Sequence, residues 1–240
     1  MIPKIIFEDD FIVVINKPSG MISNEAQSTT ELTVQKWFSE KIQITNDKSQ
    51  EGEFYEKGGI VHRLDKDTSG VMVLAKTPKA YEALKIQFLE RKTVKKYTAL
   101  IHNTFTDKHG EINQPVERHP KERKKFTVGR DLSRMAITEW NVVGEFKNNE
   151  NTFSLMELLP HTGRTHQLRV HMQYMHHPIV GDPIYGFKKT WREDLLWCPR
   201  LFLHAKYLEF VHPGTNKRVY FEAELTDELK KVLEKLVKVY

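Results

Sequence analysis

The stretch 58–70, GGIVHRLDKDTSG, has glycines at both ends and charged side chains between them, a mixture that could carry chemistry. Two interpretations are possible. In the first, Asp67, Thr68 and Ser69 bond to nearby main-chain amides, and the stretch is a tight turn that satisfies its own polar groups. In the second, the loop presents the carboxylate of Asp65 to a substrate. The residues by themselves leave both interpretations open.

Positively charged side chains gather in two further places. One run, at 91–96, ends beside Tyr97, and the other, RHPKERKKF, contains Lys121, Arg123, Lys124 and Lys125. A short basic run is usually a solvated surface. The aromatic residues among these cations and the net charge of +5 fit a polyanionic partner as well. RNA binding and a solvated face are therefore equally good interpretations of these runs.

The eleven histidines invite a metal-site interpretation, because four of them recur every five residues: His161, His166, His171 and His176. On a helix each step of five rotates the side chain by about 140°, and on a strand it alternates between the two faces. Neither geometry brings four imidazoles to one ion. The metalloprotease, P-loop and serine-hydrolase motifs are also absent from the sequence. We therefore expect no metal site.

The composition indicates a soluble cytoplasmic protein with no membrane segment. A single cysteine, Cys198, excludes an internal disulfide and points to a reducing compartment. The longest apolar runs, at 11–15 and 71–75, are far shorter than the roughly 20 residues of a membrane span. The first residues, MIPKIIFEDD, lack the charged and apolar regions of a signal peptide.

Strands and helices must position these groups, and the apolar pattern predicts where they lie. Strands are expected on both sides of the turn 8–10, at 70–76 and 94–101, as an antiparallel pair at 135–143 and 152–159, and as a hairpin at 201–213 and 218–225. Helices are expected at 31–42, from Thr77-Pro78 to about 91, at 163–175, and after a cap at Thr226. The polar segment 45–59 is expected to be a mobile loop.

This mixture of many strands and scattered helices predicts an α+β fold on a largely antiparallel mixed β-sheet, with helices and loops at its sides. No break in composition marks a second domain. At 240 residues the chain fits one domain, so we expect a single domain over 1–240.

Several stretches, taken in order, resemble the RluA/RluD family of RNA pseudouridine synthases. They are HRLDKDTSG, EDDFIVVINKPSGM, KKYTAL, RHPKERKKF, TGRTHQLRVHMQYMHHPIVGDPIYG and LFLHAKYLEFVHP, and together they run from about residue 5 to residue 224. Each stretch alone is a weak signal, whereas the ordered set is specific. The resemblance implies the catalytic fold of that family and the isomerisation of uridine to pseudouridine in folded RNA, without a cofactor or a metal.

The resemblance also implies roles for individual residues. Asp65 is implied as the catalytic aspartate, Tyr97 as the residue that packs against the target base, and Arg63 as the side chain that fills the gap when the uridine flips out. Arg169 is implied as the guanidinium beside Asp65. Because Arg164 lies five residues away on the same predicted helix and points elsewhere, we do not choose it. Tyr97 could also be an ordinary core tyrosine of its strand.

By the same resemblance His62 and 67–69 hold the shape of the loop, and Lys121, Arg123, Lys124 and Lys125 hold phosphates. The implied partner is structured RNA, either rRNA or tRNA, and we expect a monomer with no obligate protein partner. Many relatives carry a small RNA-binding domain ahead of the catalytic one. Because the first strand of the resemblance begins by about Lys4, we expect no such domain here. RNA choice would then fall to 45–59 and the basic loop. Two alternatives are a catalytically silent RNA-binding module and a nucleosidase that releases free uracil.

Overall fold

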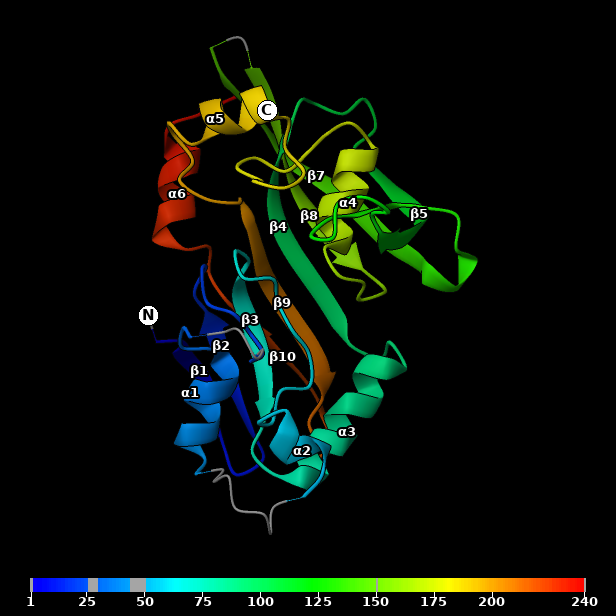
Figure 1. Cartoon of the computed structure of the whole chain (residues 1–240). Helices are drawn as coiled ribbons and strands as arrows, with labels where there is room; N and C mark the ends of the chain where they lie inside the picture. The colour runs from blue at the N-terminus through cyan, green and yellow to red at the C-terminus, as the bar shows by residue number, and fades with distance from the viewer. Residues whose placement is uncertain (1, 26–29, 44–50, 150, 240) are drawn as a thin grey trace. The chain divides into compact units, whose positions relative to one another are not determined.

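The computed structural model describes residues 2–25, 30–43, 51–149 and 151–239. Within these ranges the chain forms eleven strands, six α-helices and one 3-10 helix (Figure 1). The chain divides into two compact units, one made of Met1–Val94 and Ala205–Glu224 and the other of Lys95–His204 and Leu225–Tyr240. Each unit therefore combines segments that are far apart in the sequence. That the whole chain acts as a single domain stays a prediction.

The first unit is built on buried strands. Its strand order is β1-β2-β3-β9, with β10 paired to β9. The bounds are Lys4–Glu8 for β1, Ile12–Lys17 for β2, Ser69–Ala75 for β3, Leu203–Val211 for β9 and Arg218–Glu222 for β10, and the helices are α1 (Val34–Lys41), α2 (Glu53–Glu56) and α3 (Pro78–Leu89). Every residue of β3 is buried. That is why its sequence, SGVMVLA, is almost continuously apolar instead of alternating.

The second unit has the strand order β4-β8-β7-β5-β6, with β11 paired to β7. The bounds are Val94–His102 for β4, His109–Arg118 for β5, Phe126–Val128 for β6, Met135–Asn148 for β7, Asn151–Pro160 for β8 and Val237–Lys238 for β11. The helices are α4 (Gln167–Tyr174), α5 (Lys188–Asp194) and α6 (Asp227–Glu234), and η1 (Leu132–Arg134) is the 3-10 helix. Helix α4 packs against β5, β6, β7 and β8 (Figure 1). Its inward residues Leu168 and Met172 join a core cluster with residues of β5, β7 and β8.

Most of the predicted elements are confirmed. The pairs β1–β2, β7–β8 and β9–β10 are antiparallel, as expected. Helix α3 begins at the predicted cap, where the Thr77 hydroxyl accepts a hydrogen bond from the Ala80 amide at 3.2 Å and Pro78 takes the first helical position. The α+β class is therefore confirmed. The strands β5, β6 and β11 and helix α5 were not predicted.

Two predictions of local structure were wrong in part. The helix expected at 163–175 begins only at Gln167, because the Gln167 side-chain oxygen accepts from the Arg164 amide at 3.1 Å and His166 takes a left-handed conformation with φ of 56°. Arg164 therefore lies before the helix, and the reason given for preferring Arg169 over it does not hold. In the expected loop 45–59, residues 53–56 form helix α2. Residues 45–50 lie outside the described ranges.

Gly70, in β3, lies where the strands of the first unit are packed too closely to admit a side chain. Its φ is +123°, and a Cβ there would lie 2.2 Å from the Ala205 main-chain oxygen. Gly52 has a φ of +112° with nothing within 4 Å of such a Cβ, so it is a matched control for backbone strain alone. We expect Gly70→Ala to lower the free energy of unfolding by about 2 kcal/mol more than Gly52→Ala, as measured by urea denaturation. Equal losses would contradict this explanation.

Candidate functional site

The segment that follows β2 holds the loop that carries Asp65. Lys17, at the end of β2, is fully buried. Its ammonium donates to the main-chain oxygens of Pro18 at 2.9 Å, Met21 at 2.7 Å and Lys66 at 3.2 Å. A buried ammonium needs such acceptors because it has lost its water. The contact with Lys66 therefore ties the Asp65 loop to the strand β2.

Further hydrogen bonds fix the main chain on both sides of Asp65. The Ser23 hydroxyl donates to the Leu64 oxygen at 2.7 Å and accepts from the Leu64 amide at 3.2 Å. The Ser19 hydroxyl donates to the Asp67 oxygen at 2.7 Å. Within the loop, the Thr68 amide donates to the Asp65 oxygen at 3.2 Å, which closes a turn. The turn and the presentation of a carboxylate are therefore compatible, since the main chain is fixed while the Asp65 side chain is half-buried.

His62 supports the same loop, in agreement with its predicted structural role. Its Nε2 accepts from the Val73 amide at 3.1 Å, and its ring stacks on Phe88 with centroids 4.4 Å apart. Arg63, the next residue, is exposed. Its predicted role, to fill the gap that the flipped uridine leaves, stays a prediction.

In the second unit, Arg169 of α4 forms a buried ion pair with Asp182. The Arg169 Nε donates to one carboxylate oxygen at 2.7 Å and Nη2 donates to the other at 2.8 Å. Only 2% of the Arg169 side chain and none of the Asp182 side chain is exposed. Asp182 was not predicted. The pattern Gly-Asp-Pro at 181–183 is a turn signal that could have pointed to it. The predicted pairing of Arg169 with Asp65 stays a prediction.

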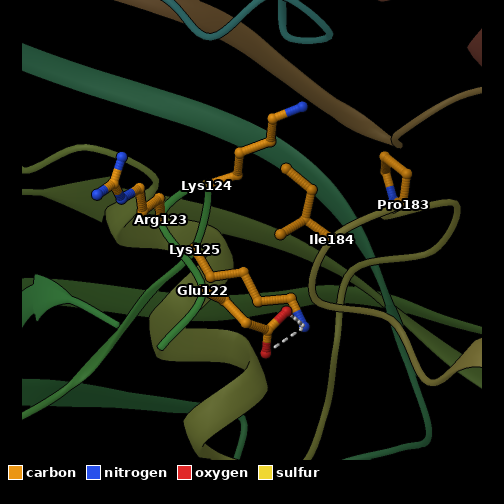
Figure 2. Close-up of a pocket in the computed structure, with 6 residues that line it drawn as sticks. All are labelled: Glu122, Arg123, Lys124, Lys125, Pro183 and Ile184. Carbon is orange, nitrogen blue, oxygen red and sulfur yellow. Dashed lines mark hydrogen bonds and ion pairs between the residues drawn. The ribbon is translucent and has the colours of Figure 1, made fainter. Parts of the chain in front are cut away.

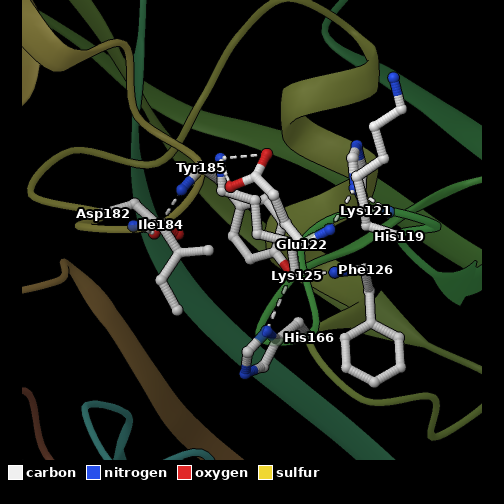
Figure 3. A network of polar contacts seen from close by, with 9 residues as sticks. All are labelled: His119, Lys121, Glu122, Lys125, Phe126, His166, Asp182, Ile184 and Tyr185. Carbon is white, nitrogen blue, oxygen red and sulfur yellow. Dashed lines mark hydrogen bonds and ion pairs between the residues drawn. The ribbon is translucent and has the colours of Figure 1, made fainter.

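Tyr185 links this ion pair to the basic loop. The Arg169 guanidinium lies over the Tyr185 ring, 5.0 Å from its centroid. The Tyr185 hydroxyl accepts from the Phe126 amide at 3.0 Å and lies 2.8 Å from Nδ1 of His166 (Figure 3). Phe126 is the first residue after the basic loop. The fold therefore brings the implied substrate arginine and the implied phosphate-binding loop into one network.

The basic loop, residues 119–125, has an ordered main chain. Nδ1 of His119 accepts from the Glu122 amide at 3.0 Å, and the Lys125 amide donates to the Glu122 oxygen at 2.9 Å. The Lys125 ammonium pairs with the Glu122 carboxylate at 3.1 Å. The other three predicted cations are exposed and have no ion pair among the described residues: Lys121, Arg123 and Lys124.

Tyr97 lies on β4, half-buried, opposite Leu158 of β8. Its ring packs against the apolar cluster that includes Leu158 and Leu168. The core interpretation accounts for this packing, and the contact of Tyr97 with a base stays a prediction.

The regularly spaced histidines have separate surroundings. His171 is fully buried, with Nδ1 2.9 Å from the Thr138 hydroxyl and Nε2 3.2 Å from the Gln114 oxygen. Burial lowers its pKa to about 4, so the ring is neutral near pH 7. In the described part of the chain no three metal-ligating side chains come together. No helix described there is long and apolar enough to cross a membrane.

Comparison with known proteins gives consistent similarities. Residues 11–174 match the model of the RNA pseudouridylate synthase family. A Bacillus subtilis (strain 168) protein named uncharacterized RNA pseudouridine synthase YlyB is 37% identical over 98% of this chain and 73% of its own length. Ribosomal large subunit pseudouridine synthase D of Pseudomonas aeruginosa is 35% identical over 94% and 69%. The solved structure of human RNA pseudouridylate synthase domain containing 1 aligns with a TM-score of 0.74 and 26% identity, over 96% of this chain and 87% of that one.

The buried ion pair predicts a large effect of removing one charge. Asp182→Asn keeps the shape of the side chain but leaves the Arg169 guanidinium without the carboxylate it contacts. We expect it to lower the free energy of unfolding by about 3 kcal/mol, measured by urea denaturation. Asp107→Asn, at an exposed position, is the control and should change it by less than about 0.5 kcal/mol. If both variants are equally stable, the ion pair does not hold the 182–185 segment.

Proposed function

Because the chain belongs to the RNA pseudouridylate synthase family, and is thus an isomerase that converts uridine to pseudouridine in RNA, we propose that its substrate is structured ribosomal RNA. The observation that carries this proposal is the similarity, over nearly the whole chain, to relatives named ribosomal large subunit pseudouridine synthase D. The alternative is a tRNA substrate, which mapping of new pseudouridines in cellular RNA would reveal. We expect the protein to work in the cytoplasm, as a monomer.

We assign the chemistry to Asp65. Isomerisation breaks the bond between N1 of uracil and C1′ of the ribose, joins C5 to C1′, and moves the C5 proton away while N1 gains one. Cleavage develops positive charge on the ribose. A carboxylate can stabilise that charge, bond to C1′ or take a proton from the sugar. The hydrogen bonds of Ser19 and Ser23 to the main chain support this role, because a reacting group has to be held in a fixed position.

The target base must leave its stack before Asp65 can reach the ribose. Flipping a nucleotide costs a few kcal/mol, and a planar guanidinium in the vacated space offsets part of that cost. Arg63 is exposed and two residues from Asp65 in the chain, which suits this task. Tyr97 would stack on the flipped base, with its hydroxyl near the C5 proton, and Arg169 would help to hold the substrate.

Asp65→Asn separates catalysis from RNA binding. It removes the anion and preserves the size of the side chain, so we expect pseudouridine formation to fall by at least about a thousandfold while the RNA dissociation constant changes less than about threefold. Product is counted by mapping pseudouridine in ribosomal RNA from a strain that lacks the protein. Asp107→Asn, at an exposed position outside the loop, is the control and should retain activity. An active Asp65→Asn enzyme would exclude the assigned role.

The same assay distinguishes the two alternatives. A silent RNA-binding module would bind ribosomal RNA and leave no new pseudouridine in it. A nucleosidase would release free uracil and leave abasic RNA of lower mass, whereas an isomerase leaves the mass of the RNA unchanged. Mass measurement of the treated RNA therefore decides between isomerisation and hydrolysis.

The basic loop predicts a change in the salt dependence of RNA binding. Replacing Lys121, Arg123, Lys124 and Lys125 with alanine should weaken binding and reduce the slope of log K against log salt by about 3, because each phosphate contact releases counterions. The control replaces four exposed lysines outside the loop: Lys57, Lys79, Lys189 and Lys217. That variant loses the same charge and should keep a steeper slope than the loop variant. Identical slopes would remove the loop from the RNA interface.

A further inference from the structure

A pocket of about 340 Å³ lies between the basic loop and the segment after Gly181 (Figure 2). Its lining residues are Glu122, Arg123, Lys124, Lys125, Pro183 and Ile184. We propose that this pocket binds one nucleotide of the RNA substrate, with the phosphate at Arg123 and Lys124 and the base against Pro183 and Ile184. The inference rests on the proposed function in that RNA is the ligand.

The charges at the pocket favour a phosphate. Glu122 contributes the one carboxylate among the lining residues, and the ammonium of Lys125 pairs with it at 3.1 Å. These two charges offset each other. Arg123 and Lys124 are exposed, and neither forms an ion pair with any residue that the structure describes. Their positive charges are therefore available to an anion, and a phosphate accepts hydrogen bonds from both kinds of side chain.

The opposite wall of the pocket is apolar. Pro183 is exposed and Ile184 is half-buried, and Figure 2 shows both on the side facing the loop. Ile184 also packs on the buried cluster of Val116, Val170 and Tyr185, so its position is fixed. An inorganic anion would gain nothing from this wall. A nucleotide has both an anionic phosphate and an apolar face on its base, and the pocket volume lies within the range of small-ligand sites.

The two walls are held together before any ligand binds. The Asp182 carboxylate accepts from the Ile184 amide at 2.9 Å, which fixes the apolar wall. The hydroxyl of Tyr185, the next residue, accepts from the Phe126 amide at 3.0 Å, directly after the charged wall (Figure 3). One residue therefore sets the distance between segments that lie about sixty positions apart in the sequence. A preformed pocket needs little ordering when it binds a nucleotide.

The experiment asks whether Ile184 contacts one particular base. Fragmented ribosomal RNA is selected for the fragment that binds the wild-type protein most tightly, and each nucleotide of it is replaced in turn by an abasic one. We expect one abasic position to weaken wild-type binding about tenfold, which corresponds to the loss of the apolar contact. Ile184→Ala should bind the intact fragment about tenfold more weakly and show no further loss at that position, because the two changes remove the same contact.

Controls and a second variant keep the outcome decisive. Leu196→Ala truncates an exposed apolar side chain outside the pocket. It should lose affinity at the same abasic position, and by the same factor, as the wild type. Lys124→Ala, at an exposed position that should not affect folding, should weaken binding about tenfold, while Lys189→Ala should not. The proposal would be overturned if each abasic replacement lowered the affinity of Ile184→Ala as much as that of the wild type. It would also be overturned if no RNA fragment bound.

Failure of the inference and failure of the proposed function have different results. In one case the fragment binds and Ile184→Ala becomes insensitive to the one abasic position, but no pseudouridine forms in the RNA; this result would support the pocket and contradict the function. In the other case pseudouridine forms, but Ile184→Ala is as sensitive to every abasic position as the wild type; this result would support the function and contradict the pocket.

Discussion

The buried ion pair between Arg169 and Asp182 organises the second unit. Two charges that have lost their water are stable only when they are paired and further hydrogen-bonded, and this pair meets both conditions. The Arg169 guanidinium donates to both carboxylate oxygens, and one of these oxygens also accepts from the amides of Ile184 and Tyr185. A single carboxylate thus joins helix α4 to the segment that follows Gly181. The Tyr185 ring beneath the guanidinium carries the same constraint to the basic loop through the Phe126 amide.

The Asp65 loop of the first unit follows a similar physical logic with different residues. Its main chain is held at 64 by Ser23, at 66 by Lys17 and at 67 by Ser19. These three residues belong to the end of β2 and the segment after it. In the Asp65 loop and in the basic loop, hydrogen bonds to main-chain atoms hold the chain. Main-chain contacts fix the position of a loop without specifying its side chains. A loop can then combine a rigid course with charged side chains that act on a substrate, which is what positioned phosphate contacts and a reacting carboxylate both require.

Local sequence signals predicted the elements whose formation depends on neighbouring residues. The cap at Thr77-Pro78, the hairpin of β7 and β8 and the buried strand β3 each have a signal that lies within a few residues. The boundary of α4 was missed because the residue that ends the preceding turn, Gln167, acts through its side chain, which also donates to the Ile137 oxygen and the Thr138 hydroxyl on β7. Strand β5 was missed because its polar, partly exposed residues have no clear period, and β6 because it has only three residues. Strand β5 forms by pairing with β6 and with β7.

The sequence by itself determined the family to which the chain belongs and the residue types available for its chemistry, because ordered motifs and their charges are local properties of the chain. It singled out Asp65, Arg169 and the basic loop, but it did not indicate what holds them. The contacts of Arg169 with Asp182, of Tyr185 with Phe126 and of Lys17 with Lys66 join positions separated by 13, 59 and 49 residues. Only the tertiary structure decided these contacts, because a buried polar group must find its partner among whatever residues the fold brings near it, and sequence spacing places no limit on that choice.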